Sequence, residues 1–245
     1  MTDEPSMDCA DSFSSTAVPS SSYMMTTMIK LDLLAKSKSE FTIEHSNADL
    51  SMNNYLKGCK WSPDGTCILT SSNDSVLRLF DTNDIFNLSN EKSHTQEIEE
   101  SGEIKASLKL YEPELIYDFE WYPFMNSNDP ISACLIASSK SNQIHLFDAY
   151  TGEIRCSYKA FNHLEELIPA FSIGFNSTCS HIYGGYQNST IKIFDISRPG
   201  KNYEDVKLEN NNDYHLKGII SFLAFSSSTT TSRLYAAGTY LREIG

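Results

Sequence analysis

The residue types that most often carry catalysis are scattered along this sequence. Of its six histidines, none lies at the helical i, i+4 spacing from another histidine or from a cysteine. The signatures G-x-S-x-G, G-x-x-x-x-G-K-[ST] and H-E-x-x-H, which build nucleophile, phosphate and zinc sites, are absent from the 245 residues. Glu165 and Glu166 are neighbours that point in different directions, so they do not form an acid–base pair. We therefore expect no catalytic residues, no enzymatic activity and no cofactor.

The six cysteines give no sign of a metal site or a disulfide framework, since no two of them form a C-x-x-C pair. Four lie in predicted strands, where a thiol behaves as a small apolar side chain: Cys59, Cys67, Cys134 and Cys156. This usage fits a reducing compartment, the cytosol or the nucleus. We expect no bound metal.

The stretch Asn53–Asp81 organises the chain, and it predicts three short strands joined by two tight turns. The strands are expected at Leu56–Trp61, Cys67–Ser71 and Val76–Asp81. In the turn Ser62–Gly65, proline presets φ and glycine supplies a positive φ. Strands joined this tightly pair antiparallel. Such a meander exposes both of its faces, so it needs neighbouring sheets to cover it.

The chain supplies those neighbours by repeating the stretch. The first strand recurs with an aromatic residue, at spacings of 60, 54 and 50 residues: Trp61, Trp121, Phe175 and Phe225. The third strand recurs as apolar, basic or His, apolar, Phe, Asp, and it gives three Phe-Asp pairs: Phe80-Asp81, Phe147-Asp148 and Phe194-Asp195. His145 fills the basic position, which favours a structural role. Repeats of this size are typical of WD-type β-propeller blades, with a β-sandwich as the alternative. We expect the four first-strand aromatic rings to be buried between sheets.

We therefore predict an all-β, WD40-type β-propeller over residues 41–245, with about three and a half blades and an incomplete ring. Its further strands are expected at 104–110, 133–138, 143–148, 154–160, 170–176, 181–186, 190–196, 204–208, 219–225 and 234–240. The last blade stops at Gly245, after its second strand. We expect a chain truncated at its C-terminus, an N-terminal fragment that needs further blades to remain soluble.

Other segments are expected to lie outside the blades. Residues 1–40 should form a disordered or weakly structured segment, because the first 22 are rich in Ser, Thr, Asp and Pro. Phe41–Glu44 is expected to be extended. Between Asp84 and Glu114, eight acidic residues stand against three lysines. This composition indicates a solvated loop or, as the alternative, an acidic loop that docks a partner. Pro123–Ser132 is a second insertion, which lengthens a turn.

The charge balance excludes some classes of function. A net charge of −13 and a pI near 4.8 argue against a chain that coats nucleic acid through bulk charge. No apolar run approaches the roughly 18 residues that span a bilayer. The first 20 residues hold acids and serines in place of a secretory signal. We expect no membrane association.

Four stretches carry a family resemblance: Asn54–Thr70, Ile144–Leu167, Ile191–Gly200 and Gly218–Phe225. They resemble the WD-repeat proteins of small Cajal body ribonucleoproteins. The turn W-S-P-D-G is common to many WD repeats. The connector A-F-N-H-L-E-E-L and the turn F-D-I-S-R-P-G are more specific to this family. The likeness runs from Phe41 to Gly245.

The resemblance implies an RNA-binding WD-repeat scaffold. Such a scaffold recognises small Cajal body RNAs and telomerase RNA through their CAB-box element. It also implies partners among H/ACA ribonucleoprotein proteins and Cajal body proteins, a location in the Cajal bodies of the nucleus, and support of telomere maintenance. One alternative is a protein-only WD-repeat adaptor for ribonucleoprotein assembly. Another is a subunit of an enzyme whose catalytic domain lies elsewhere.

RNA loops are read by aromatic stacking and by hydrogen bonds to unpaired bases, which a local patch can supply. Six residues on predicted loops have suitable side chains: Tyr122, Phe124, Phe161, Asn162, His163 and Arg198. As alternatives, the aromatic residues pack in the core or in the rim, Arg198 pairs with an acidic turn neighbour, and Asn162 caps its own loop. For His163 the alternative is a bond to local backbone. We expect the connector Phe161–Leu167 to bind RNA through its first three residues, because Glu165 and Glu166 repel phosphate. The alternative is that these two glutamates contact a basic protein partner.

Overall fold

The computed structural model describes residues 36–37, 39–41, 54–92, 103–208, 217–226, 235–241 and 244, with the backbone alone for 88–92. These residues belong to one compact unit, Leu33–Gly245. Most of the segment 1–40, for which the sequence predicts disorder, lies outside the described residues.

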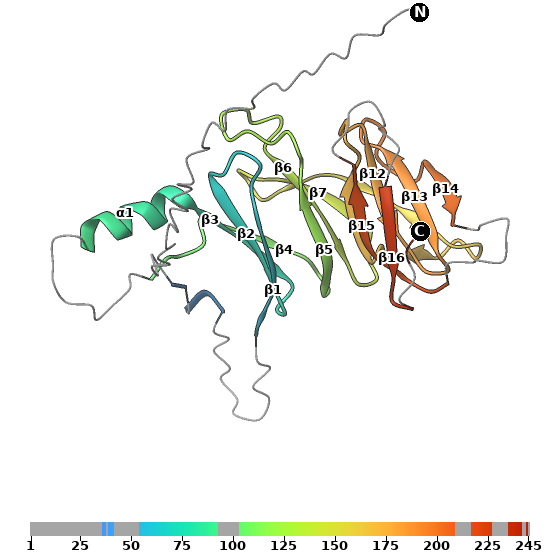
Figure 1. Ribbon diagram of the computed structural model, residues 1–245, viewed down its shortest axis with the longest axis horizontal. Helices are drawn as coiled ribbons and strands as arrows, with labels where there is room; N and C mark the ends of the chain where they lie inside the picture. Colours follow the sequence, from blue (N-terminus) through green and yellow to red (C-terminus); the bar gives the residue numbers. More distant parts are fainter. Residues whose placement is uncertain are drawn as a thin grey trace, which may run out of the picture. The chain divides into compact units, whose positions relative to one another are not determined.

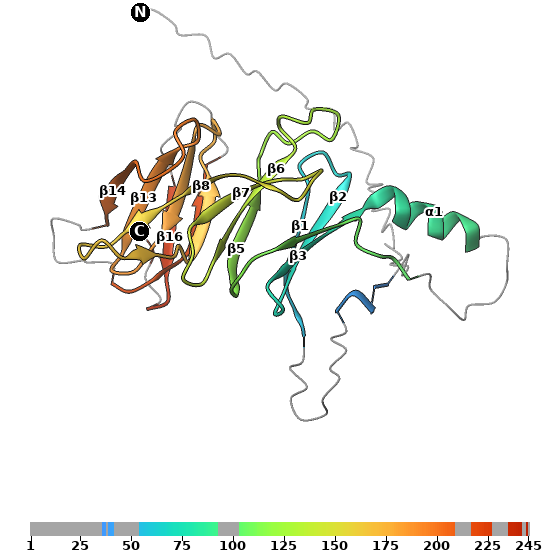
Figure 2. The same ribbon diagram turned by 180° about the vertical axis from the view of Figure 1, so that it is seen from behind.

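The described residues form five antiparallel sheets, one of them the two-stranded connector between sheets 2 and 3. The other four follow one another along the chain, and in the first three of these the four strands lie in chain order. Sheet 1 consists of β1 (Leu56–Trp61), β2 (Cys67–Ser72), β3 (Val76–Asp81) and β4 (Leu108–Tyr111). Sheet 2 consists of β5 (Ile116–Trp121), β6 (Cys134–Ser139), β7 (Ile144–Asp148) and β8 (Ile154–Tyr158). Sheet 3 consists of β11 (Ser172–Phe175), β12 (His181–Gly185), β13 (Thr190–Asp195) and β14 (Tyr203–Lys207). Sheet 4 has two described strands, β15 (Ile220–Phe225) and β16 (Tyr235–Thr239). Figures 1 and 2 show the sheets side by side in this order, which confirms the predicted all-β repeat.

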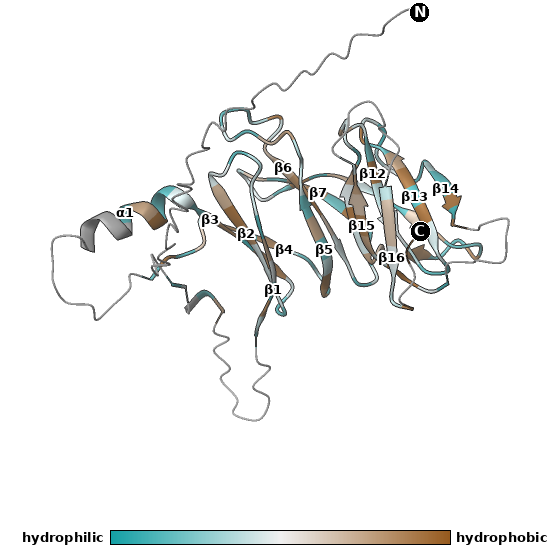
Figure 3. Ribbon diagram, in the orientation of Figure 1, coloured by the Kyte–Doolittle hydropathy of each residue, from teal (hydrophilic) through white to brown (hydrophobic). Residues whose placement is uncertain are grey.

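The central strands are apolar because both of their faces are covered. In β6, Leu135 points into a core between sheets 1 and 2, and Ile136 points into a core between sheets 2 and 3. Both side chains are fully buried. The strand therefore reads as a continuous apolar run, as buried strands do, and not as an alternation. Hydrophobic residues accordingly gather in the strands (Figure 3).

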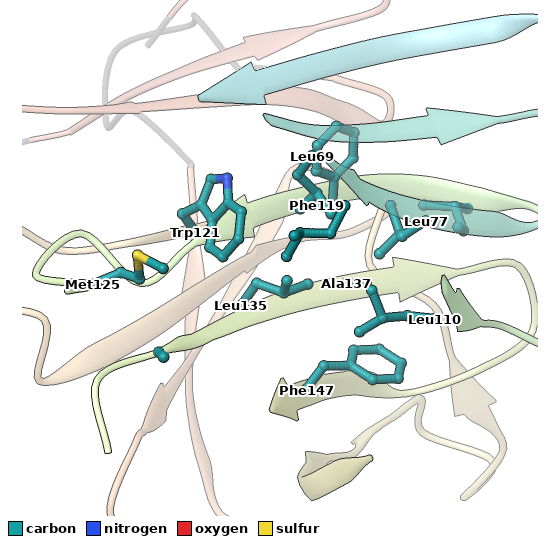
Figure 4. Packing of buried hydrophobic residues seen from close by; sticks show 12 residues of the cluster. Leu69, Leu77, Leu110, Phe119, Trp121, Met125, Leu135, Ala137 and Phe147 are labelled. Atoms are coloured by element: carbon teal, nitrogen blue, oxygen red, sulfur yellow. The ribbon is translucent and has the colours of Figure 1, made fainter. Parts of the chain in front are cut away.

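The aromatic residue at the end of a first strand packs on the preceding sheet. Trp121, at the end of β5, is 2% exposed and lies against sheet 1 (Figure 4). Its indole Nε1 donates to Lys60 O at 3.3 Å. Phe175 ends β11 and is buried in the core between sheets 2 and 3. Phe225 ends β15 and is partly buried, with 5.1 Å between its ring centroid and that of Tyr183 in sheet 3.

Trp61 differs from the expectation that it is buried. It occupies the same repeat position at the end of β1, yet it is 60% exposed. By strand alternation its ring points away from sheet 2, and among the described residues no sheet precedes sheet 1 to cover it. This outer face is covered in part by the 3-10 turn η1 (Ser39–Phe41). The Phe41 ring lies 6.3 Å from the ring of Phe80.

The repeated Phe-Asp pair closes each third strand. The three rings are at most 4% exposed: Phe80, Phe147 and Phe194. Each following aspartate accepts the N–H of the residue two positions on, at 2.8–2.9 Å: Asp81 from Asn83, Asp148 from Tyr150 and Asp195 from Ser197. This local bond turns the chain out of the sheet.

Two segments have a conformation that the sequence did not predict. Phe41, expected to be extended, ends η1, and residues 42–44 lie outside the described part of the chain. The stretch after Asp84, expected to be a loop, begins inside helix α1 (Thr82–Lys92). Asp81 caps this helix through its bond to Asn83. The helix escaped prediction because its capping residue is also the last residue of the strand repeat.

The described residues hold no helix that is both long and apolar enough to span a bilayer. Within the same ranges, no three His, Cys, Asp or Glu side chains gather as a metal site would require.

Candidate functional site

The connector between sheets 2 and 3 is a small hairpin and not the loop that the sequence predicts. After β8 ends, β9 (Ala160–Phe161) pairs antiparallel with β10 (Leu167–Ile168). The predicted single strand up to Ala160 is thus interrupted after Tyr158. Two short strands hold the turn 162–166 at both of its ends, which fixes its position relative to sheet 3.

Asn162 organises this turn. Its Oδ1 accepts the N–H groups of Leu164 at 2.8 Å and Glu166 at 2.9 Å. Its Nδ2 donates to Glu166 Oε2 at 2.9 Å. Glu165 has a φ of 61°, the left-handed conformation that such a tight turn requires. The amide of Asn162 is therefore engaged at both ends in capping its own loop, as the alternative for this residue stated.

A pocket of about 580 Å³ lies between the connector and sheet 3. The connector contributes Phe161, Asn162 and His163, so three of the six candidate residues line one cavity. Sheet 3 and the turn after β12 contribute a wall of basic, acidic, amide and aromatic side chains: Tyr186, Gln187, Asn188, Lys192, Tyr203, Asp205 and Lys207. The segment that leads into β11 adds Ile168, Pro169 and Phe171. We call this cavity the connector pocket.

Lys192 is the buried charge of the connector pocket, with 5% of its surface exposed. Its Nζ lies 2.5 Å from Oδ1 of Asp205, the residue opposite it on β14. The same ammonium lies 4.2 Å from the ring centroid of Tyr203 and 5.8 Å from that of Tyr186. A buried ammonium needs such a carboxylate to offset its desolvation. The two rings add cation–π stabilisation.

The tyrosines tie the wall to the connector. The hydroxyl of Tyr203 accepts the N–H of Phe161 at 3.3 Å and donates to Phe161 O at 3.2 Å. Tyr186 is 2% exposed, and burial raises the pKa of its hydroxyl far above the ordinary value. Tyr186 therefore stays neutral at physiological pH. At the pocket's edge, His163 and Lys207 are exposed.

The other three candidates do not line the connector pocket. The ring of Tyr122 lies edge-on to Phe175 at 5.6 Å and to Phe124 at 6.1 Å, which is packing at the rim of sheet 2. Phe124 is 59% exposed. Arg198 has a side chain that is 77% exposed, and its Nε lies 3.7 Å from Asp195 Oδ2. Arg198 is thus paired with an acidic neighbour in its own turn, which is the alternative to RNA contact that the sequence left open for it.

Known proteins resemble this chain in sequence. Residues 45–81 match the WD domain, G-beta repeat family. The chain is 44% identical to telomerase Cajal body protein 1 of Mus musculus, over 78% of this chain and 34% of the relative. It is 41% identical to the Homo sapiens protein of the same name, over 86% of this chain and 35% of the relative. The chain is a homologue of telomerase Cajal body protein 1. The homolog from Drosophila melanogaster is 34% identical, over 62% of this chain and 27% of the relative.

The chain thus spans about a third of the length of the telomerase Cajal body proteins that it matches. The homology confirms the family resemblance that the sequence showed in its connector and in the turn Phe194–Gly200.

Sequence reasoning missed the half of the pocket that sheet 3 contributes. Lys192 was visible only as the basic residue of the strand repeat, a position that indicates structure. Asp205 lies in the predicted fourth strand 204–208 and Tyr203 directly before it, where nothing in the local pattern points to a site. These residues become neighbours of Phe161 only because β14 folds back beside β9.

Proposed function

We propose that this protein is a non-catalytic, RNA-binding WD-repeat scaffold that recognises small Cajal body RNAs and telomerase RNA. In this role it directs their ribonucleoproteins to Cajal bodies in the nucleus and supports telomere maintenance. Its partners would include H/ACA ribonucleoprotein proteins and Cajal body proteins. The homology supports the proposal, since the relatives' name joins telomerase to the Cajal body.

The observation that carries the proposal is the composition of the connector pocket. Phe161 offers an aromatic face on which an unpaired base stacks, and the hydroxyl of Tyr203 holds Phe161 in place. Lys207 and His163 are exposed at the edge of the pocket. Both side chains can therefore contact a phosphate or the polar edge of a base while the protein keeps its fold. Because the amide of Asn162 is engaged in its own turn, we assign that residue to positioning the turn and not to reading a base. Recognition of this kind is local, so it is compatible with a net charge of −13.

The test is RNA binding by the double variant H163A/K207A of the purified protein. We expect its affinity for an H/ACA-type RNA with a CAB box to fall by about 1.5–3 kcal/mol, the range for a hydrogen bond to a charged group. The matched control is K159A/L164A, which removes an exposed lysine and a second turn residue outside the pocket. If H163A/K207A keeps its fold and its affinity is unchanged, the connector pocket does not bind the RNA.

A pull-down with RNA sequencing separates this proposal from the protein-only adaptor. We expect H/ACA-type RNAs to be enriched with the wild type and depleted with H163A/K207A. Recovery of proteins without RNA would favour the adaptor.

A further inference from the structure

The same position in the third strand of sheets 1, 2 and 3 holds a buried base. The residues are Arg78, His145 and Lys192, with exposed fractions of 6%, 4% and 5%. A buried base requires a polar or acidic partner, and each of the three faces a carboxylate. The carboxylates come from different places in the chain, and this difference sets sheet 3 apart.

In sheets 1 and 2, a glutamate from outside the sheet reaches the base. In sheet 1 it does so in addition to Asp74 of the turn between β2 and β3, whose Oδ2 lies 2.6 Å from Arg78 Nη2. Glu40 of η1 places Oε2 at 3.8 Å from Arg78 Nε and at 2.5 Å from Lys109 Nζ. Glu112, between β4 and β5, places Oε1 at 2.8 Å from His145 Nδ1. The two glutamate side chains are 9% and 0% exposed, so they seal the space over each base.

Sheet 3 has no such glutamate among the described residues. The segment before β11 carries Ile168-Pro169, where the segment before β5 carries Glu112-Pro113. The acid beside Lys192 is Asp205 of its own sheet, and the Asp205 side chain is 53% exposed. In sheet 2, Glu112 fills the space over the buried base. The equivalent space in sheet 3, between Ile168 and Lys192, is part of the connector pocket.

We infer that the connector pocket binds a phosphate of an unpaired nucleotide over Lys192, in the place that external glutamates take in sheets 1 and 2. The inference rests on the proposed RNA binding and names its anionic subsite. Two features favour a nucleotide over an acidic peptide. Lys207 is a second cation on the same wall, and the Phe161 ring lines the same cavity and offers a face for the base. Asp205 is half exposed, so it can turn to solvent when the phosphate arrives.

The test compares adenosine 5′-monophosphate with adenosine by isothermal titration calorimetry on the purified protein. We expect the monophosphate to bind at least about tenfold more tightly, the effect of one charge-assisted contact. K192M should abolish this preference, and D205N should strengthen monophosphate binding because the competing carboxylate is gone. K159M, at an exposed lysine outside the pocket, is the matched control and should keep the preference. Thermal melting checks that each variant is folded. If K192M does not fold, the test uses D205N, which should bind the monophosphate more tightly, and K207M, which should lose the preference for it.

Equal affinities for the monophosphate and adenosine would overturn the inference. A preference that survives in folded K192M, or in K207M where K192M does not fold, would also overturn it. Tighter binding of a Glu-Phe peptide than of the monophosphate would also overturn it and assign the subsite to a protein carboxylate. The two proposals fail separately. If H163A/K207A loses H/ACA RNA but the wild type shows no monophosphate preference, the subsite is wrong and the RNA function stands. If the wild type prefers the monophosphate but does not bind H/ACA RNA, the subsite stands and the RNA function is wrong.

Discussion

Burial sets the reactivity of individual thiols in this protein. Cys134 and Cys179 are 4% and 3% exposed, and burial raises the pKa of each thiol to about 11. Cys59 on β1 is exposed. Because the thiolate is the reactive species, the two buried cysteines remain inert thiols at neutral pH and act as packing residues.

We expect iodoacetamide at pH 8 to alkylate Cys59 at least about tenfold faster than Cys134 or Cys179. Site-resolved mass spectrometry after a timed quench measures the three rates. In urea, where burial is lost, the rates should converge, which is the control. Native alkylation of Cys134 at the rate of Cys59 would contradict its place in the core between sheets 2 and 3.

At the scale of the elements, the turn between β1 and β2 in sheet 1 contacts the insertion between β5 and β6 in sheet 2. Asp64 accepts hydrogen bonds from Ser62 Oγ at 2.7 Å, from Thr66 N–H at 3.2 Å and from Thr66 Oγ1 at 2.8 Å. It also accepts the N–H of Ser127, in the insertion Pro123–Ser132, at 2.7 Å. Burial acts to raise the pKa of Asp64, but these bonds outweigh it and hold the pKa well below its ordinary value. The ionised carboxylate therefore joins the two sheets.

Asp64→Asn should lower the free energy of unfolding by about 1 kcal/mol at pH 7, the net worth of a typical hydrogen bond. Since folding lowers the Asp64 pKa, its stabilisation is fully present above the unfolded-state pKa of about 3.9 and is lost as the pH falls through the folded-state pKa. The gap between wild type and variant should therefore narrow progressively below about pH 4. Urea unfolding from neutral to acid pH measures it, with Glu114→Gln as an exposed control. A gap that does not change with pH would show that the charge of Asp64 plays no part.

Across the molecule, each sheet supplies a wall for the next. Lys60 Nζ of sheet 1 donates to Phe119 O of sheet 2 at 2.6 Å. Asp118 Oδ2 of sheet 2 accepts the N–H of Ile173 in sheet 3 at 2.9 Å. Ser172 Oγ of sheet 3 donates to Ile220 O of sheet 4 at 3.1 Å. The first strands of the four sheets are thus linked in series. The aromatic residue at the end of a first strand therefore stabilises the fold only where a preceding sheet covers its ring.

Trp121→Ala should cost roughly 3–5 kcal/mol of unfolding free energy, the range for a large buried side chain. Trp61→Ala, at the same repeat position but 60% exposed, should cost less than about 1 kcal/mol. Urea denaturation of the two variants measures the difference, and each serves as the control for the other. Equal losses would mean that another sheet or a second copy covers Trp61 in solution.

The sequence by itself determined the strands, their order and the family. β1 and β3 begin and end where the repeat predicts, because the Pro-Asp-Gly turn after β1 and the Phe-Asp pair that ends β3 are local signals. Adjacent strands joined by tight turns have one way to pair. The connector motif was specific enough to indicate the homologues.

Only the tertiary structure decided which residues face each other. Trp61 and Trp121 have the same local pattern, and their burial differs because a sheet packs on one and not on the other. Three of the predicted site residues meet Lys192 in one pocket because β14 folds back beside the connector, a contact between distant parts of the chain. Contacts of this kind arise from packing, which leaves no trace in the periodicity of either segment.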